Sequence, residues 1–175
     1  MDFKPYHILF PVLMEHETRS VSISGDSNIP DGDYVFLEVY CADKTCDCRR
    51  VFIQIHQANP VFKQFHAATI SYGWEPLSFY KKWGGGVFDD MLKEMKGPAL
   101  DKMNTQSPYA PFFLDSFINM IENDKAYQAR LRRHYFQFKW KTGMNTPKDI
   151  IFDPTQLCPC KSGAKFKYCC GKRGQ

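Results

Sequence analysis

The chain of 175 residues lacks any run of about eighteen uninterrupted apolar residues, the length that a membrane-spanning helix needs. Its first five residues, Met1-Asp2-Phe3-Lys4-Pro5, also lack the basic and apolar regions of a secretory signal peptide. Together these two absences predict a soluble, cytoplasmic protein.

Fingerprints of common enzyme classes are absent as well. Gly84-Gly85-Gly86 is not followed by the Lys-Ser/Thr pair of a nucleotide phosphate loop. The chain also shows no dinucleotide-binding fingerprint and no serine triad. An enzyme is therefore the less favoured interpretation.

Cysteine is missing from the 109 residues between Cys48 and Cys158, and the seven cysteines fall into two tight clusters. The first cluster is Cys41, Cys46 and Cys48, and the second is Cys158, Cys160, Cys169 and Cys170. Seven thiols cannot all pair, and a secreted disulfide framework would scatter its cysteines along the chain. Short gaps within two clusters instead predict metal ligands.

Acidic residues are rare in the last third of the chain. Residues 125–175 carry 12 Lys+Arg against 2 Asp+Glu, a balance of +10, while residues 1–124 carry 11 against 17, a balance of −6. A basic segment can attract nucleic acid, anionic lipid or an acidic protein face. It can equally neutralise a zinc ion held by four thiolates, which is a net −2 centre. Both interpretations stay open.

The composition and the residue patterns predict an α+β fold for a body over residues 1–141. Hydrophobic residues make up 43% and aromatic residues 15% of the chain, enough for a packed core. Period-two alternation and turn formers predict an N-terminal antiparallel β-meander with strands over 19–24, 33–40, 51–55 and 65–72. Helical patterns over 75–83, 87–96, 111–123 and 125–141 predict a helical middle.

The last of these predicted helices is amphipathic. Its apolar stripe of Tyr127, Leu131, Tyr135 and Phe138 is expected in the core. The opposite face is expected to be a solvated surface, and it carries Arg130, Arg132, Arg133, Lys139 and Lys141. Residues 142–156 have the composition of a linker, which would let a small C-terminal unit over 157–175 move independently of the body.

This C-terminal unit has the cysteine spacing C-x-C-x8-C-C, from Cys158 to Cys170. Four soft ligands in two close pairs suit the tetrahedral geometry of Zn²⁺. So few residues cannot bury enough surface to fold alone, so metal binding must supply the folding free energy. Four protein ligands leave no open position on the metal, which favours a structural role over a catalytic one.

These residues resemble the SEC-C motif, a zinc knuckle found at the C-terminus of the SecA translocation motor and on many bacterial proteins. The family pattern is matched at Cys158, Pro159, Cys160, Ser162, Gly163, Lys167, Cys169 and Cys170. The chain departs from it at Lys161, where the family commonly has glycine, and it has the Cys rather than the His alternative at Cys170. In SecA the knuckle docks on an export chaperone and can touch ribosomes and lipid, so the resemblance implies a docking role.

The body also resembles a group of bacterial SEC-C proteins of unassigned activity. The resemblance rests on Glu15-His16-Glu17-Thr18-Arg19, Cys46-Asp47-Cys48-Arg49-Arg50, Tyr72-Gly73-Trp74-Glu75 and Gln106-Ser107. It implies a grouping and no mechanism.

The first cysteine cluster predicts a second zinc, and hence two per chain, but it needs a fourth ligand. If the first hairpin turns near Ile29, residues whose numbers sum to about 58 face each other, so Glu17 lies opposite Cys41 and His16 lies at the same sheet end. His16 is therefore the preferred fourth ligand. His134 is the rival, although its place on the apolar stripe favours a core histidine. A water in the fourth position would make the site a candidate hydrolytic centre.

Three functions follow from these patterns. The leading one is a zinc-binding adaptor that docks on a chaperone, a ribosome or a translocation partner through its knuckle. The first alternative is nucleic-acid binding through residues 125–173, with base stacking on Phe136, Phe138, Trp140 or Tyr168. The second alternative is a metalloenzyme at the Cys41/Cys46/Cys48 site.

Overall fold

An antiparallel sheet and the helices packed on it make up the body of the computed structural model, which describes residues 2–26, 28–58, 66–86, 89–143 and 153–172. The strands are β1 (Phe3–Pro5), β2 (Arg19–Ile23), β3 (Gly32–Cys41), β4 (Arg50–Gln57), β5 (His66–Gly73) and β6 (Ala99–Leu100). Their order in the sheet is β1-β3-β4-β5-β6, and β2 pairs with β3 next to β1. The α+β prediction is confirmed.

Six helices accompany the sheet in the described part of the chain. They are α1 (Tyr6–Leu9), α2 (Pro11–Glu17), α3 (Leu77–Gly84), α4 (Asp89–Lys96), α5 (Ala110–Asn123) and α6 (Lys125–Lys141). The Asp124 side chain accepts a hydrogen bond from the backbone N–H of Tyr127 and so caps α6. No helix in the described segments is long and apolar enough to cross a membrane.

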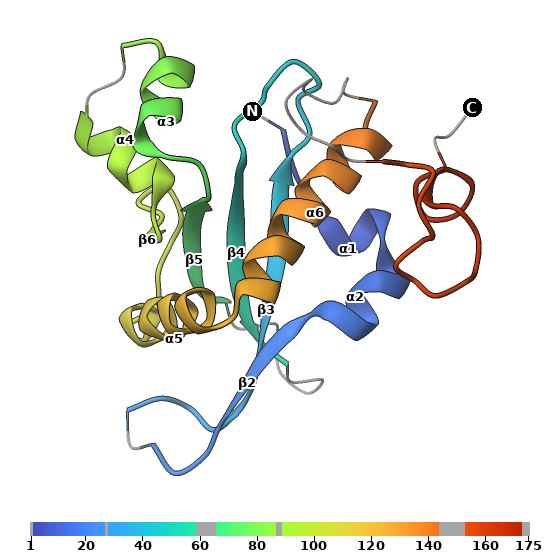
Figure 1. Cartoon of the computed structure of the whole chain (residues 1–175). Helices are drawn as coiled ribbons and strands as arrows, with labels where there is room; N and C mark the ends of the chain where they lie inside the picture. Colours follow the sequence, from blue (N-terminus) through green and yellow to red (C-terminus); the bar gives the residue numbers. More distant parts are fainter. Residues whose placement is uncertain (1, 27, 59–65, 87–88, 144–152, 173–175) are drawn as a thin grey trace.

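The core lies between one face of the sheet and helices α5 and α6 (Figure 1). Tyr34 on β3 packs on Phe113 of α5, with ring centroids 4.7 Å apart, and Tyr40 packs on Phe138 of α6 at 5.6 Å. Residues Val51, Ile53 and Ile55 alternate with half-buried neighbours along β4 and face the same helices. This alternation leaves Phe52 on the opposite face of the sheet.

The hairpin register predicted from the sequence was wrong. Arg19 pairs with Phe36, so the paired numbers sum to 55 and not to 58, and Cys41 pairs with Phe3. The N-terminal strand β1 occupies the edge of β3 where Glu17 was expected. Because β1, α1 and α2 are short and non-periodic, the sequence patterns did not reveal them.

The C-terminal half of α6 also differs from the amphipathic helix that the sequence predicts. Every residue from His134 to Phe138 is buried, and Lys139, which was expected on a solvated face, is only 1% exposed. The sheet covers one side of the helix. The loop that carries the first cysteine cluster, α1 and the C-terminal knuckle contact its other sides.

Candidate metal centres

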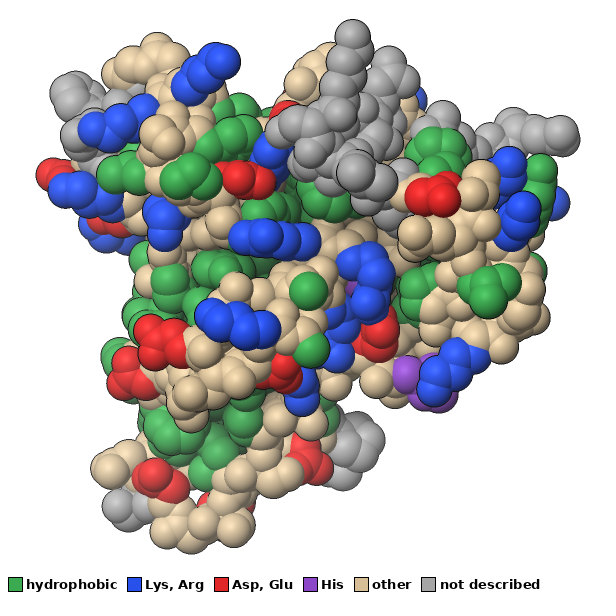
Figure 2. Space-filling view, in the orientation of Figure 1, with side chains coloured by type: hydrophobic (Ala, Val, Ile, Leu, Met, Phe, Trp, Pro, Cys, Tyr) green, Lys and Arg blue, Asp and Glu red, His purple; other side chains and the backbone are tan. Residues whose placement is uncertain are grey.

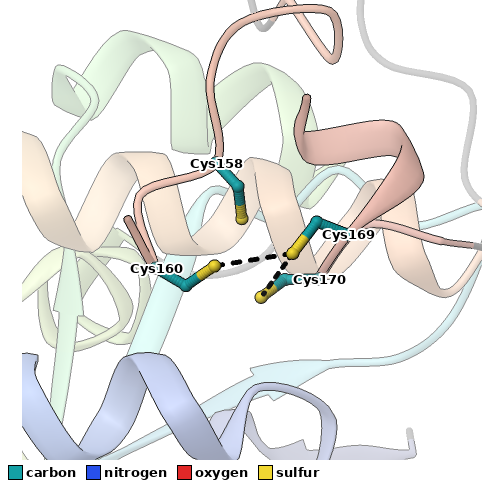
Figure 3. A group of neighbouring side chains, drawn as sticks. All are labelled: Cys158, Cys160, Cys169 and Cys170. Carbon is teal, nitrogen blue, oxygen red and sulfur yellow. Dashed lines mark hydrogen bonds between the residues drawn. The ribbon is translucent and has the colours of Figure 1, made fainter. Parts of the chain in front are cut away.

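Four cysteine side chains converge in the C-terminal knuckle (Figure 3). Their sulfur atoms all lie within 4.8 Å of one another, with 3.5 Å between Cys160 Sγ and Cys169 Sγ and 4.0 Å between Cys169 Sγ and Cys170 Sγ. A tetrahedron with Zn–S bonds of ~2.3 Å separates its sulfurs by about 3.8 Å. The spacing of these thiols therefore fits a tetrahedral metal ion, and none of the seven cysteines is in a disulfide.

Turns on either side of the pairs bring the four sulfurs together. Leu157 and Lys165 form an isolated antiparallel bridge, and the backbone N–H of Cys158 donates to Ala164 O at 2.8 Å. A short 3-10 helix, η1 (Phe166–Tyr168), then presents Cys169 and Cys170. A hydrogen bond with the Ser162 hydroxyl is the main cause that lowers the pKa of Cys160, to about 6. A thiol that ionises easily is a ready metal ligand.

The first cysteine cluster also converges, as the sequence predicts. The ligand atoms of Cys41, Cys46 and Cys48 lie within 4.8 Å of one another, in and just after strand β3. Hydrogen bonds with the Cys46 and Cys48 thiols lower the pKa of Cys41. This cluster is compatible with metal binding by three sulfurs.

His16 is not brought to this cluster. It lies exposed in the last turn of α2, and the three sulfurs gather no histidine or carboxylate ligand from the described residues. The reason is the register: β1, and not the segment around residue 17, pairs beside Cys41.

His134, the rival ligand, is instead a buried core histidine with both ring nitrogens engaged. Its Nδ1 lies 2.7 Å from Glu38 Oε2, and its Nε2 lies 2.7 Å from Glu17 Oε2. Tyr6 stacks on the imidazole with ring centroids 4.3 Å apart. The side chain therefore has no nitrogen left for a metal.

The two cysteine clusters share a backbone feature. Arg49 and Lys161 each follow the second cysteine of a Cys-x-Cys turn, and they have φ of 44° and 61°. Among the described segments these are the only non-glycine residues with positive φ. Such a conformation is costly for a residue with a Cβ, so it persists only where the surroundings demand it. The same tight turn thus aims two sulfurs at one point in each cluster.

Lys139 is the residue at the first cluster that the sequence analysis missed. Its Nζ donates to the backbone oxygens of Asp43 and Cys46, at 2.9 and 2.8 Å, and the side chain is 1% exposed. Within the described segments no carboxylate lies within ion-pair distance of this ammonium. Position 139 follows Leu131 and Tyr135 by eight and four residues, a helical spacing that places it on the buried stripe.

The basic surface of α6 is largely tied to the body. Figure 2 shows Lys and Arg side chains gathered on the face that α6 crosses. Arg133 pairs with Glu17 at 2.6 Å, and Arg132 donates to Trp74 O. Phe136 and Phe138, expected to stack on bases in the nucleic-acid alternative, are buried. The C-terminal half of α6 therefore offers few exposed aromatic and unpaired basic side chains, which single-stranded nucleic acid needs.

Comparison with known proteins identifies the C-terminal unit. A family model for the SEC-C motif matches residues 155–172. These residues form a SEC-C motif. The chain is also similar to the protein translocase subunit SecA of a Nitratiruptor species, with 28% identity over 106 residues. That match covers 57% of this chain and 12% of the SecA protein, so it runs well beyond the SEC-C motif but spans a small part of the relative. No solved structure matches the chain.

The SEC-C motif contacts the body. The Phe166 ring is 1% exposed and stacks on Phe10, with centroids 6.1 Å apart, and Trp140 Nε1 of α6 donates to Gly171 O at 3.1 Å. Figure 1 shows the motif beside α1, α2 and the end of α6. The predicted linker falls largely on residues 144–152, which lie outside the described residues. The predicted boundaries at 141 and 157 stay predictions.

Proposed function

We propose that this chain is a cytoplasmic adaptor that binds two zinc ions and docks on a protein partner through its SEC-C knuckle, residues 157–175. The observation that carries the proposal is the cluster of four sulfurs, which fills a tetrahedral coordination shell and leaves no position for a substrate. A closed site of this kind shapes a surface and does not catalyse. The similarity to a protein translocase subunit SecA supports a partner from translocation. An export chaperone and the ribosome are the candidates that the resemblance to the SEC-C motif implies.

The outward side of the knuckle is the proposed docking face. Phe166 is buried against the body, whereas Leu157 is 72% and Tyr168 is 68% exposed. Lysines accompany these two apolar side chains, at positions 161, 165 and 167. Exposed apolar groups among positive charges suit a partner with an apolar, acidic surface.

The charge of Lys139 supports the second zinc, at Cys41, Cys46 and Cys48. A buried ammonium is costly without a nearby negative charge. Three thiols bound to Zn²⁺ lose their protons and form a net −1 centre, which is the counter-charge that this buried lysine needs. The fourth ligand is open. A water there is what the hydrolytic alternative requires, but three thiolates make zinc a weak Lewis acid, so we favour a structural site.

Native mass spectrometry with metal analysis tests the two sites. We expect two zinc ions per chain, and one after either Cys160→Ser or Cys48→Ser. Lys139→Met keeps the shape of the buried side chain and removes its charge, so zinc affinity at the first cluster should fall by roughly 10–100-fold. Lys141→Met, on the same helix and half-exposed, is the matched control. Full retention of affinity in Lys139→Met would refute the charge argument, and a single zinc in the wild type would refute the second site.

Binding to purified export chaperone and to purified ribosomes tests docking. We expect a Leu157→Ser/Tyr168→Ser variant to lose at least tenfold in affinity for one of them, as for a hot-spot pair. Ile8→Ser on α1, where the side chain is 63% exposed, should have no effect. Equal binding by all three proteins contradicts the proposed face. If the binding instead weakens steeply with salt and an RNA competitor abolishes it, the nucleic-acid alternative is favoured.

A further inference from the structure

The face of the sheet opposite α5 and α6 carries a groove that the metal centres do not use. Its volume is about 610 Å³, within the range of small-molecule sites. It lies between α4 with the segment after β6 on one side and strands β1, β4 and β5 on the other. Phe52 of β4 pairs with Val39 and Ser71, which places these three residues on this second face.

The walls of the groove are mainly apolar and adaptable. They include three of the seven methionines of the chain, together with two phenylalanines and a leucine: Met91, Met95, Met103, Phe3, Phe52 and Leu100. Met91 is 52% and Met103 is 92% exposed. Exposed methionines are costly in water, and their flexible, polarisable side chains fit apolar ligands of varied shape.

Arg50 is the buried charged group in the wall. The residue is 8% exposed, its guanidinium lies 4.6 Å from the Phe52 ring centroid, and Nη2 donates to Ser71 Oγ at 2.8 Å. Its Nε is buried and has no hydrogen-bond partner. In the described part of the chain no carboxylate forms an ion pair with it. A buried guanidinium in the wall that no carboxylate pairs with attracts an anion.

The acidic groups at the groove limit which anion fits. Asp101 and Glu94 also line it, and Glu94 pairs with Lys102. A dianion such as a phosphate ester would meet these carboxylates with only one buried guanidinium in its favour. A single negative charge on a long apolar body suits the groove better.

We propose that this groove binds a small amphipathic monocarboxylate, with its carboxylate on Arg50 and its hydrocarbon chain along the methionines. A medium-chain fatty acid is the simplest member of this class. The site is separate from the zinc-dependent docking proposed above, and its test does not depend on that function.

Titration of the zinc-loaded, full-length protein with decanoate, followed by ¹³C-methyl methionine NMR, tests the proposal. We expect shifts at the methyl groups of Met91, Met95 and Met103 and none at Met14, which is buried on α2. Decanol, with the same chain and no charge, should bind at least tenfold more weakly. Equal affinity for the two, or shifts confined to other methionines, overturns the proposal.

Two variants test whether the carboxylate of decanoate binds at Arg50. Arg50→Gln should reduce the affinity for decanoate at least tenfold and leave that for decanol unchanged. Because Arg50 is buried and its loss could unfold the protein, Met91→Glu is the second variant: this exposed position tolerates a charge, and the new carboxylate should repel decanoate. Met91→Gln is its matched control and should bind decanoate as the wild type does. If Met91→Glu binds decanoate unchanged, or if an uncharged apolar peptide amide binds the groove more tightly than decanoate does, the proposal fails.

Discussion

Lys161 has a backbone conformation that the turn between the cysteines of the SEC-C motif requires. It follows Cys160 with φ of 61°, the left-handed conformation that glycine adopts without strain. The preference for glycine at this position of the SEC-C motif thus has a steric reason. This chain tolerates a lysine there because the two flanking cysteine pairs define the backbone.

Lys161→Gly should therefore stabilise the knuckle. Relief of the left-handed strain is worth about 1–2 kcal/mol, and the larger entropy of glycine in the unfolded chain offsets about half of it. We expect the unfolding free energy at saturating zinc to rise by ~0.5–1 kcal/mol. Lys165→Gly, where φ is −67°, is the matched control and should not stabilise. Equal effects of both substitutions would show that the backbone strain is not significant.

Glu17, His134 and Glu38 form a hydrogen-bonded group whose charges depend on pH. Burial lowers the pKa of His134, but the two carboxylates raise it by more, so its pKa lies above 6.5. Burial raises the pKa of Glu17, yet the hydrogen bond and charge of His134, with Arg133, lower it to about 2. The charged form of this group is therefore a feature of the folded state.

The stability of the protein should depend on pH through this histidine. A raised folded pKa means that its contribution is fully present below pH 6.5 and is lost as the pH rises through the folded value. The contribution of Glu17 is present above pH 4.5 and is lost as the pH falls toward 2. The difference in unfolding free energy between wild type and His134→Gln should hence be largest near pH 5–6 and shrink above pH 7.

Urea unfolding from pH 5 to 9 at a fixed free zinc concentration measures this difference. Zinc binding becomes tighter as the pH rises, so the comparison must be between variants at each pH and not along one curve. His16→Gln, at the exposed position in α2, serves as the control and should follow the wild type. A difference that stays constant across this range would contradict the assignment.

The contact between the knuckle and helix α6 helps to bury that helix on every side near its end. The Phe166 ring packs against Gly171, where a Cβ would lie 2.2 Å from ring atom Cε1. The Gly171 carbonyl in turn accepts the hydrogen bond from Trp140. Gly171 therefore connects the cysteine pair of the knuckle to the body.

Gly171→Ala should loosen this junction. The added methyl group must displace the Phe166 ring, at a cost of about 1–3 kcal/mol in unfolding free energy. We expect a lower melting temperature at saturating zinc and faster proteolysis of the C-terminal segment. Lys172→Ala, at an exposed neighbouring position, is the control and should behave as the wild type. A melting temperature equal to that of the control would mean that the ring moves freely.

For the whole molecule, the structure predicts that metal at the knuckle orders part of the body. Tyr6 of α1 and Phe10, which lies between α1 and α2, form a stack that continues to His134 and Phe166. A knuckle that cannot bind metal would lose its fold and uncover this stack. Strands β4 and β5 contribute no ring to this stack.

Hydrogen exchange of a Cys169→Ser/Cys170→Ser variant tests this link. We expect faster exchange in α1, α2 and the last turns of α6, and unchanged exchange in β4 and β5. The first cysteine cluster is intact in this variant and acts as an internal control. Unchanged protection in α1 and α2 would show that the knuckle is an independent unit, as the linker composition suggested.

Features of this protein that rest on local chemistry could be predicted from the order of its residues. Alternation located four of the six strands found among the described residues, and helical spacing located α3, α4, α5 and α6. The spacing of Cys158, Cys160, Cys169 and Cys170 predicted their convergence. These features depend on neighbours within a turn or two of the chain, which a sequence displays directly.

Relations between distant segments depend instead on how the whole chain packs. The pairing of Phe3 with Cys41 moved His16 away from the first cluster, and burial of Lys139 beside that cluster depends on residues some 90 positions apart. Strand register and the covering of a helix by remote loops arise from packing of the whole core, because local patterns are compatible with several registers and several partners. The pairing of His134 with Glu17 and Glu38 has the same origin.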